Sequence, residues 1–164
     1  MTELQEILIG AGAAAPPAHV VEGLAAELVH RKPIGAPHSI YEEVWHVTYW
    51  LEMSLDWARG RPTAYPASAA DGFPTVLDME RESWAALKTR FLDGLKHAAA
   101  IAGDAERLEV VVECPSKPGV ATRHMTVREQ LENAAAHNAY HMGRIVLLRQ
   151  SLGVWPPAGG GYTW

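Results

Sequence analysis

The chain has 164 residues, which is enough for one domain with a substantial hydrophobic core. Its formal net charge is −5, its basic residues are not clustered, and no run reaches the roughly 18 apolar residues of a membrane span, so we expect neither nucleic acid nor membrane as a partner. The single cysteine, Cys114, excludes an internal disulfide framework and is typical of a cytoplasmic protein.

The first third of the chain predicts two short helices followed by a long one. Residues 2–10 have the pattern of a short amphipathic helix, and residues 18–29 predict a second. Ser39-Ile40-Tyr41-Glu42 has the form of a capping box, in which the serine and the glutamate satisfy each other's backbone N–H groups. We therefore expect a long helix over residues 39–59, ended by Gly60.

The middle of the chain predicts a loop and then a second long helix. Residues 63–74 are rich in alanine, proline, glycine and serine, which is typical of a loop. Residues 75–102 predict one continuous helix with Leu77, Trp84 and Phe91 on its buried face.

The last third predicts a small hairpin and a final helix. Residues 109–113 form a β-prone run, and residues 115–119 have the composition of a turn. A second capping box begins at Thr126 and predicts a helix over residues 126–152. The chain is therefore predicted to be all-α, an up-down four-helix bundle with a short extra N-terminal helix and a small β-hairpin before the last helix. We expect one domain over residues 1–158 and a flexible C-terminal tail over residues 159–164.

Three histidines form a candidate metal site. His137 and His141 are four residues apart, so on a helix they lie one turn apart on the same face, and the apolar residues of that helix place this face inward. His46 lies on the earlier long helix, in a smaller buried sector with Trp50. A buried imidazole without partners is costly, and a metal ion would satisfy one nitrogen of each ring.

The ligand types narrow the chemistry without naming the metal. Three neutral imidazoles suit zinc, nickel, iron or copper, and we favour zinc or nickel, with iron and manganese as alternatives. No glutamate follows His137, so the zinc-protease pattern and its general base are missing, and no paired Glu-x-x-His motifs predict a di-iron site. No catalytic residue is assigned. The neighbouring polar and aromatic residues that we consider as supports or pocket walls are Glu43, Trp50, Asn133 and Arg144.

Several segments resemble the DinB/YfiT-like superfamily of four-helix-bundle metalloproteins. These segments are Pro37–His46, His137–His141, Gly143–Gln150 and Leu152–Pro157, in the same order as in the family. The resemblance implies that His46, His137 and His141 hold a divalent metal ion and that the protein forms a homodimer. It also implies a thiol-dependent transferase or isomerase, because characterised relatives include such transferases and a mycothiol-dependent maleylpyruvate isomerase.

Three functions remain open at this point. The first is a metal-dependent enzyme that joins or isomerises a small electrophile with a low-molecular-weight thiol. The second is a non-catalytic metal-binding or stress-response protein with a structural or sensing metal, in which His38, Glu43 or Cys114 closes the coordination sphere. The third is a helical dimerisation module whose histidines only make hydrogen bonds.

Overall fold

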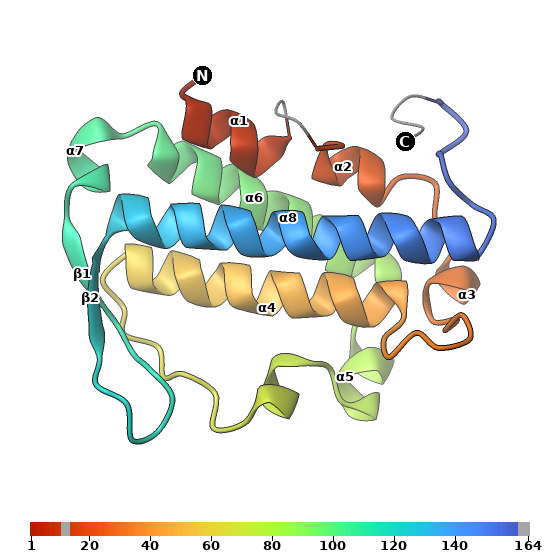
Figure 1. The fold of residues 1–164 in the computed structure, drawn as a ribbon, viewed down its shortest axis with the longest axis horizontal. Coiled ribbons are helices and arrows are strands. Elements are labelled where there is room, and N and C mark those ends of the chain that lie inside the picture. Colours follow the sequence, from red (N-terminus) through yellow and green to blue (C-terminus); the bar gives the residue numbers. More distant parts are fainter. Residues whose placement is uncertain (11–13, 161–164) are drawn as a thin grey trace.

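The computed structural model describes residues 1–10 and 14–160, and this part of the chain is built around three long helices (Figure 1). These are α4 (Ile40–Ala58), α6 (Trp84–Ala102) and α8 (Val127–Ser151). Helix α4 packs against both α6 and α8, so it occupies the centre of the bundle. The predicted all-α class is confirmed, and both predicted capping boxes are present at the starts of α4 and α8.

Short N-terminal helices pack on α6 and α8, in place of the fourth helix of the predicted bundle. Helix α1 (Glu3–Ile9) packs on α6, while α2 (Pro17–Val20) packs on α8 (Figure 1). The prediction of one helix over residues 18–29 is wrong, because the chain leaves α2 after Val20 and begins α3 (Ala26–Val29) only after a turn. Gly23 in that turn has φ of 66°, a left-handed conformation that a continuous helix does not contain.

The predicted continuous helix over residues 75–102 is also wrong. It is divided into α5 (Val76–Arg81) and α6, with Glu82 in an extended conformation between them. Ser83 starts α6 by accepting a hydrogen bond from a backbone N–H of its first turn. The carbonyl of Glu82 accepts a hydrogen bond of 2.8 Å from the Tyr41 hydroxyl, which anchors the break against α4.

The segment between α4 and α6 lies outside the bundle. Leu77, which the helical pattern placed on a buried face, is 49% exposed because α5 does not continue the line of α6. The predicted loop over residues 63–74 contains one short 3₁₀ helix, η1 (Ala69–Gly72). This loop matters for the site, because it brings Gly72 beside α4.

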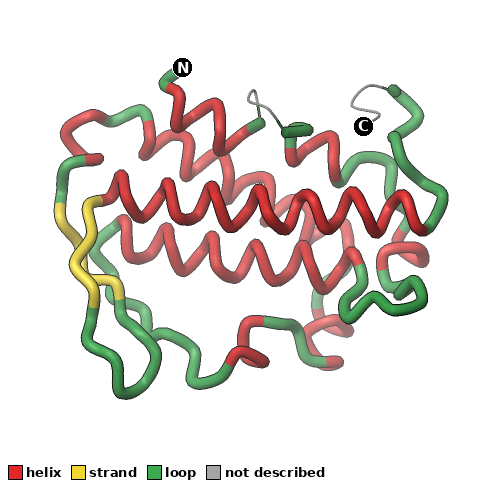
Figure 2. Tube along the Cα trace, in the orientation of Figure 1, coloured by secondary structure: helices red, strands yellow, loops and turns green. Residues whose placement is uncertain are grey.

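A two-stranded hairpin closes one end of the bundle (Figure 2). Strand β1 (Val111–Cys114) pairs antiparallel with β2 (Arg123–Thr126), and β2 leads directly into α8. The predicted hairpin is confirmed, although its loop is longer than the expected turn. A short helix that was not predicted, α7 (Ala105–Leu108), precedes it.

Two sequence expectations concern the limits of the fold. Within the described residues, none of the helices combines the length and apolar character needed to cross a bilayer. The expected tail begins at residue 159, and residues 161–164 lie outside the part of the chain that the structure describes.

Candidate metal centre

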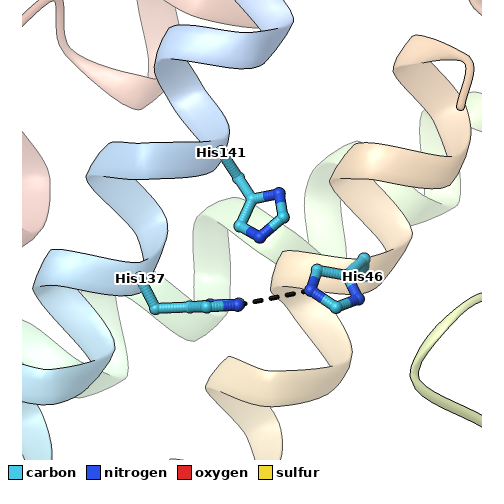
Figure 3. A group of neighbouring side chains, drawn as sticks. All are labelled: His46, His137 and His141. Carbon is cyan, nitrogen blue, oxygen red and sulfur yellow. Dashed lines mark hydrogen bonds between the residues drawn. The ribbon is translucent and has the colours of Figure 1, made fainter. Parts of the chain in front are cut away.

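Helices α4 and α8 lie side by side and bring the three histidines together (Figure 3). His46 projects from α4, and His137 and His141 project from successive turns of α8. One ring nitrogen from each lies within 4.8 Å of the others. The Nε2 atoms of His46 and His137 are 3.2 Å apart. Such a cluster could hold a metal ion, because each ring offers one nitrogen to the same point.

A backbone carbonyl fixes the orientation of the His46 ring. The Nδ1 atom of His46 lies 2.7 Å from the carbonyl oxygen of Gly72, which can only accept a hydrogen bond. The proton of the neutral ring is therefore on Nδ1, and the lone pair of Nε2 points toward the other histidines. Phe73 stacks on the same ring, with centroids 4.2 Å apart, and limits its rotation.

A buried carboxylate fixes the orientation of the His141 ring in the same way. The Nδ1 atom of His141 donates a 2.6 Å hydrogen bond to Glu43, which is 0% exposed. The other oxygen of Glu43 accepts hydrogen bonds from Arg144, at 2.9 Å from Nε and 2.7 Å from Nη2. Burial by itself would raise the pKa of the Glu43 carboxyl, but the hydrogen bonds from His141 and Arg144 outweigh it and hold that pKa below its usual value.

His46 and His137 are held in the neutral form that binds metals. Burial lowers the pKa of His46 to about 4 and that of His137 to about 4, because a charged ring would lose its hydration there. At 3.2 Å, the Nε2–H of neutral His137 can donate a hydrogen bond to the free Nε2 of His46, and a cation between the two nitrogens would take the place of this proton. A divalent cation satisfies both nitrogens, so the donor set fits the expected metal ion.

His46 and His137 lie at one end of a pocket of about 360 Å³. The pocket continues between α4 and α8 toward the hairpin and has an aromatic wall of Trp50, Trp57 and Tyr65. Arg123, at the start of β2, is exposed and also lines it. A volume of this size is sufficient for a small molecule.

The four residues that the sequence suggested as supports or pocket walls take different positions relative to the histidines and the pocket. Glu43 contacts a histidine directly, and Arg144 contacts Glu43 and not this pocket. Trp50 lines the pocket and meets both His46 and His137 edge to face, with centroids 6.3 Å apart in each pair. Asn133 lines the pocket from an exposed position on α8.

Sequence reasoning missed several neighbours of the histidines. Gly72 acts through its backbone and Phe73 reaches the site from a loop, so neither carries a local sequence signal. Asn138 and Gln130 could have been found, because they interrupt the apolar stripe of α8 and both are buried. Polar residues at core positions usually have a specific partner.

One of three comparisons with known proteins gives a match. A family model described as the DinB superfamily matches residues 18–145, a range that contains all three histidines. This match confirms the family that the sequence resembles. No curated protein and no solved structure matches the chain.

We expect the metal-free protein to lose stability as the pH falls from about 6.5 to about 4. The unfolded histidines bind a proton near pH 6.5, whereas folded His46 and His137 do so only near pH 4. Below pH 6.5 the unfolded state therefore binds more protons, and the free energy of unfolding decreases until the folded rings also titrate. Urea unfolding in the presence of a chelator, at pH values from 7.5 to 4.5 in steps of about one unit, measures this loss.

A His137→Gln variant is the control for this pH dependence. The variant retains a polar side chain at this position but has one fewer imidazole with a lowered pKa. Its free energy of unfolding should therefore fall less over the same pH range. Equal pH dependence in the variant and the parent would show that the lowered pKa of His137 does not contribute to the loss of stability.

Proposed function

Because the chain belongs to the DinB superfamily, we propose that its three-histidine centre binds a divalent metal ion. In this proposal the centre is the active site of a thiol-dependent transferase or isomerase that acts on a small electrophile. The convergence of three imidazole nitrogens, two of them from residues that line a pocket, carries this proposal. Zinc or nickel is the favoured metal, with iron or manganese as alternatives. The same proposal includes a homodimer, which the family resemblance implies, and a cytoplasmic location, which the single cysteine favours.

The surroundings of the cluster support an open coordination position. Among residues 1–10 and 14–160, no further histidine, cysteine, aspartate or glutamate joins the three histidines. One oxygen of Glu43 accepts a hydrogen bond from His141 and the other from Arg144, and the buried Cys114 thiol contacts Gln130. Structural zinc sites are closed by four protein ligands, whereas catalytic sites keep one position for water or substrate. A site with three histidines and an adjoining pocket therefore favours catalysis over a purely structural metal.

The metal and the residues around it have separate tasks in this proposal. A divalent cation, when bound, would be a Lewis acid that lowers the pKa of a thiol or of water, so that the thiolate or hydroxide is available at neutral pH. Glu43 accepts a hydrogen bond from the Nδ1–H of His141, which increases the basicity of the nitrogen that faces the centre. Arg144 keeps Glu43 ionised inside the bundle. The aromatic wall of the pocket shields a bound molecule from water.

We expect the purified protein to bind one divalent ion per chain and to lose this ion when a ligand is removed. His46→Ala and His141→Ala should each remove most of the bound metal, because two imidazoles hold a divalent ion far more weakly than three. Elemental analysis after dialysis against zinc or nickel checks the stoichiometry.

His97→Ala is the matched control for metal content, because His97 is an exposed histidine of α6 far from the cluster in sequence. This variant should retain the full metal content. A parent protein that holds no metal under replete conditions would contradict the metal centre itself.

Glu43→Gln should weaken metal binding about 10- to 100-fold without removing a ligand. The amide keeps the size of the side chain but no longer offers a charged acceptor to His141. Competition with a chromophoric chelator measures the affinity. Glu42→Gln is the matched control, since Glu42 is the adjacent carboxylate and binds Lys32 and the Ser39 backbone N–H. Equal affinities in the two variants would exclude the proposed support of His141.

The catalytic proposal predicts metal-dependent thiol conjugation. With 1-chloro-2,4-dinitrobenzene, the thiol sulfur bonds to the ring carbon, chloride leaves, and the thiol proton passes to buffer. Fully metallated protein should accelerate this reaction with at least one of glutathione, cysteine and mycothiol, and His46→Ala should not. If metallated protein turns over no electrophile with any of these thiols, the non-catalytic metal-binding function replaces the enzyme.

A further inference from the structure

Asn138 has an unusual position in the wall of the pocket. Its side chain is 5% exposed, and neither the amide oxygen nor the amide nitrogen has a hydrogen-bond partner in the described structure. Buried amides are almost always paired, because an unpaired donor or acceptor forfeits the hydrogen bonds that water would provide. Asn138 lines the pocket one residue after His137, and both amide atoms are covered in the free protein, so a bound molecule reaches them only when the side chain rotates toward the pocket.

The nearby buried polar residues do not share this property. Gln130 is 3% exposed, and its amide nitrogen donates a 3.0 Å hydrogen bond to Ser54. Its amide oxygen accepts a contact of 3.5 Å from the Cys114 thiol. Gln130 is therefore occupied at both ends, and the Ser54 oxygen is occupied as an acceptor. Of the buried pocket residues Gln130, Ser54 and Asn138, Asn138 is therefore the one whose side chain has no hydrogen-bond partner among the described residues.

Charge at the other end of the pocket is also uncompensated. Arg123 is the cation among the described pocket-lining residues, and no aspartate or glutamate belongs to that lining. No carboxylate within residues 1–10 and 14–160 forms an ion pair with Arg123, whereas the neighbouring Arg128 pairs with Glu109. In a protein of net charge −5, one free guanidinium at a pocket mouth is complementary to a monoanion.

The dimensions of the pocket set the size of the molecule. Gln130 and His137 are seven residues apart on α8, which corresponds to roughly 10 Å along the helix axis. A ligand that reaches from the hairpin end to the histidines therefore has the length of about three extended residues, which an N-acetylated dipeptide approaches. The rings of Trp50 and Tyr65, with centroids 5.1 Å apart and planes tilted by 54°, give its middle an angled aromatic surface.

We propose that this pocket binds a small, elongated carboxylate, with Arg123 pairing with its carboxylate group and Asn138 hydrogen-bonding to an amide or hydroxyl group near its histidine-facing end. The inference rests on the proposed function only in that it assigns the substrate class of the same site. A carboxylate is favoured over a phosphate because a single guanidinium matches a single negative charge. Asn138 is left unpaired in the free protein because its partner is the ligand.

Two dipeptide probes test the role of Arg123. N-acetylcysteinylglycine and its C-terminal amide differ only in the carboxylate, and calorimetry measures their affinities for metal-free and zinc-loaded protein. We expect the acid to bind about tenfold more tightly than the amide in both forms, since a charge-assisted hydrogen bond is worth about that factor. Arg123→Gln should abolish this preference, whereas Arg31→Gln, which removes a charge from an exposed residue outside the pocket, should retain it.

Asn138→Leu tests the second contact by combining binding with stability. The variant should bind both probes about tenfold more weakly, because it cannot form hydrogen bonds. Its melting temperature without ligand should equal or exceed that of the parent, because leucine fills the same volume and leaves no unpaired polar group. Unchanged affinity together with a lower melting temperature would mean that Asn138 only supports the fold, and it would overturn its role in binding.

The metal-free titration separates this inference from the proposed function. If the protein binds no metal but prefers the acid through Arg123, the proposed function fails and the carboxylate pocket stands. If metal binds but the acid and amide bind equally, or if the preference survives in Arg123→Gln, the carboxylate pocket is wrong. Failure of both probes to bind at millimolar concentration, in either form, also overturns it.

Discussion

The ionised, fully buried carboxylate of Glu43 is the interaction on which the site depends. A carboxylate inside a helical bundle is costly unless its oxygens are hydrogen-bonded, and here His141 and Arg144 provide those bonds. These bonds require α4 and α8 to lie at one separation and in one register. The same register brings His46 opposite His137. The cost of burying one charge is therefore offset by contacts that also orient the His141 ring, which couples the packing of the bundle to the geometry of the three-histidine cluster.

The site combines two regions with different character. At one end, the neutral rings of His46 and His137, depressed in pKa by burial, offer lone pairs to a common point. At the other end, the hairpin contributes the free guanidinium of Arg123. The pocket between them has aromatic and amide walls, and such convergence of a few polar groups in a largely apolar cleft is typical of small-molecule sites. A metal that only connected two helices would not need this pocket.

Local signals in the sequence predicted the parts of the fold that local physics determines. The capping boxes at Ser39 and Thr126 located the starts of α4 and α8, and the four-residue spacing of the α8 histidines placed them on one face. Long-range contacts determined what was missed. The break at Glu82 depends on the Tyr41 hydroxyl from another helix, and the Gly72 carbonyl reaches His46 from a loop. Neither contact leaves a periodic pattern in the chain.

X-ray absorption spectroscopy of the zinc-loaded protein tests the central claim most directly, because it counts the atoms around the metal. An open three-histidine centre predicts imidazole scattering from three histidines at about 2.0 Å and one further oxygen atom from solvent. It also predicts that an added thiol replaces this oxygen with sulfur at about 2.3 Å. A fourth protein ligand that excludes the thiol, or a spectrum without imidazole scattering, would contradict an open three-histidine centre.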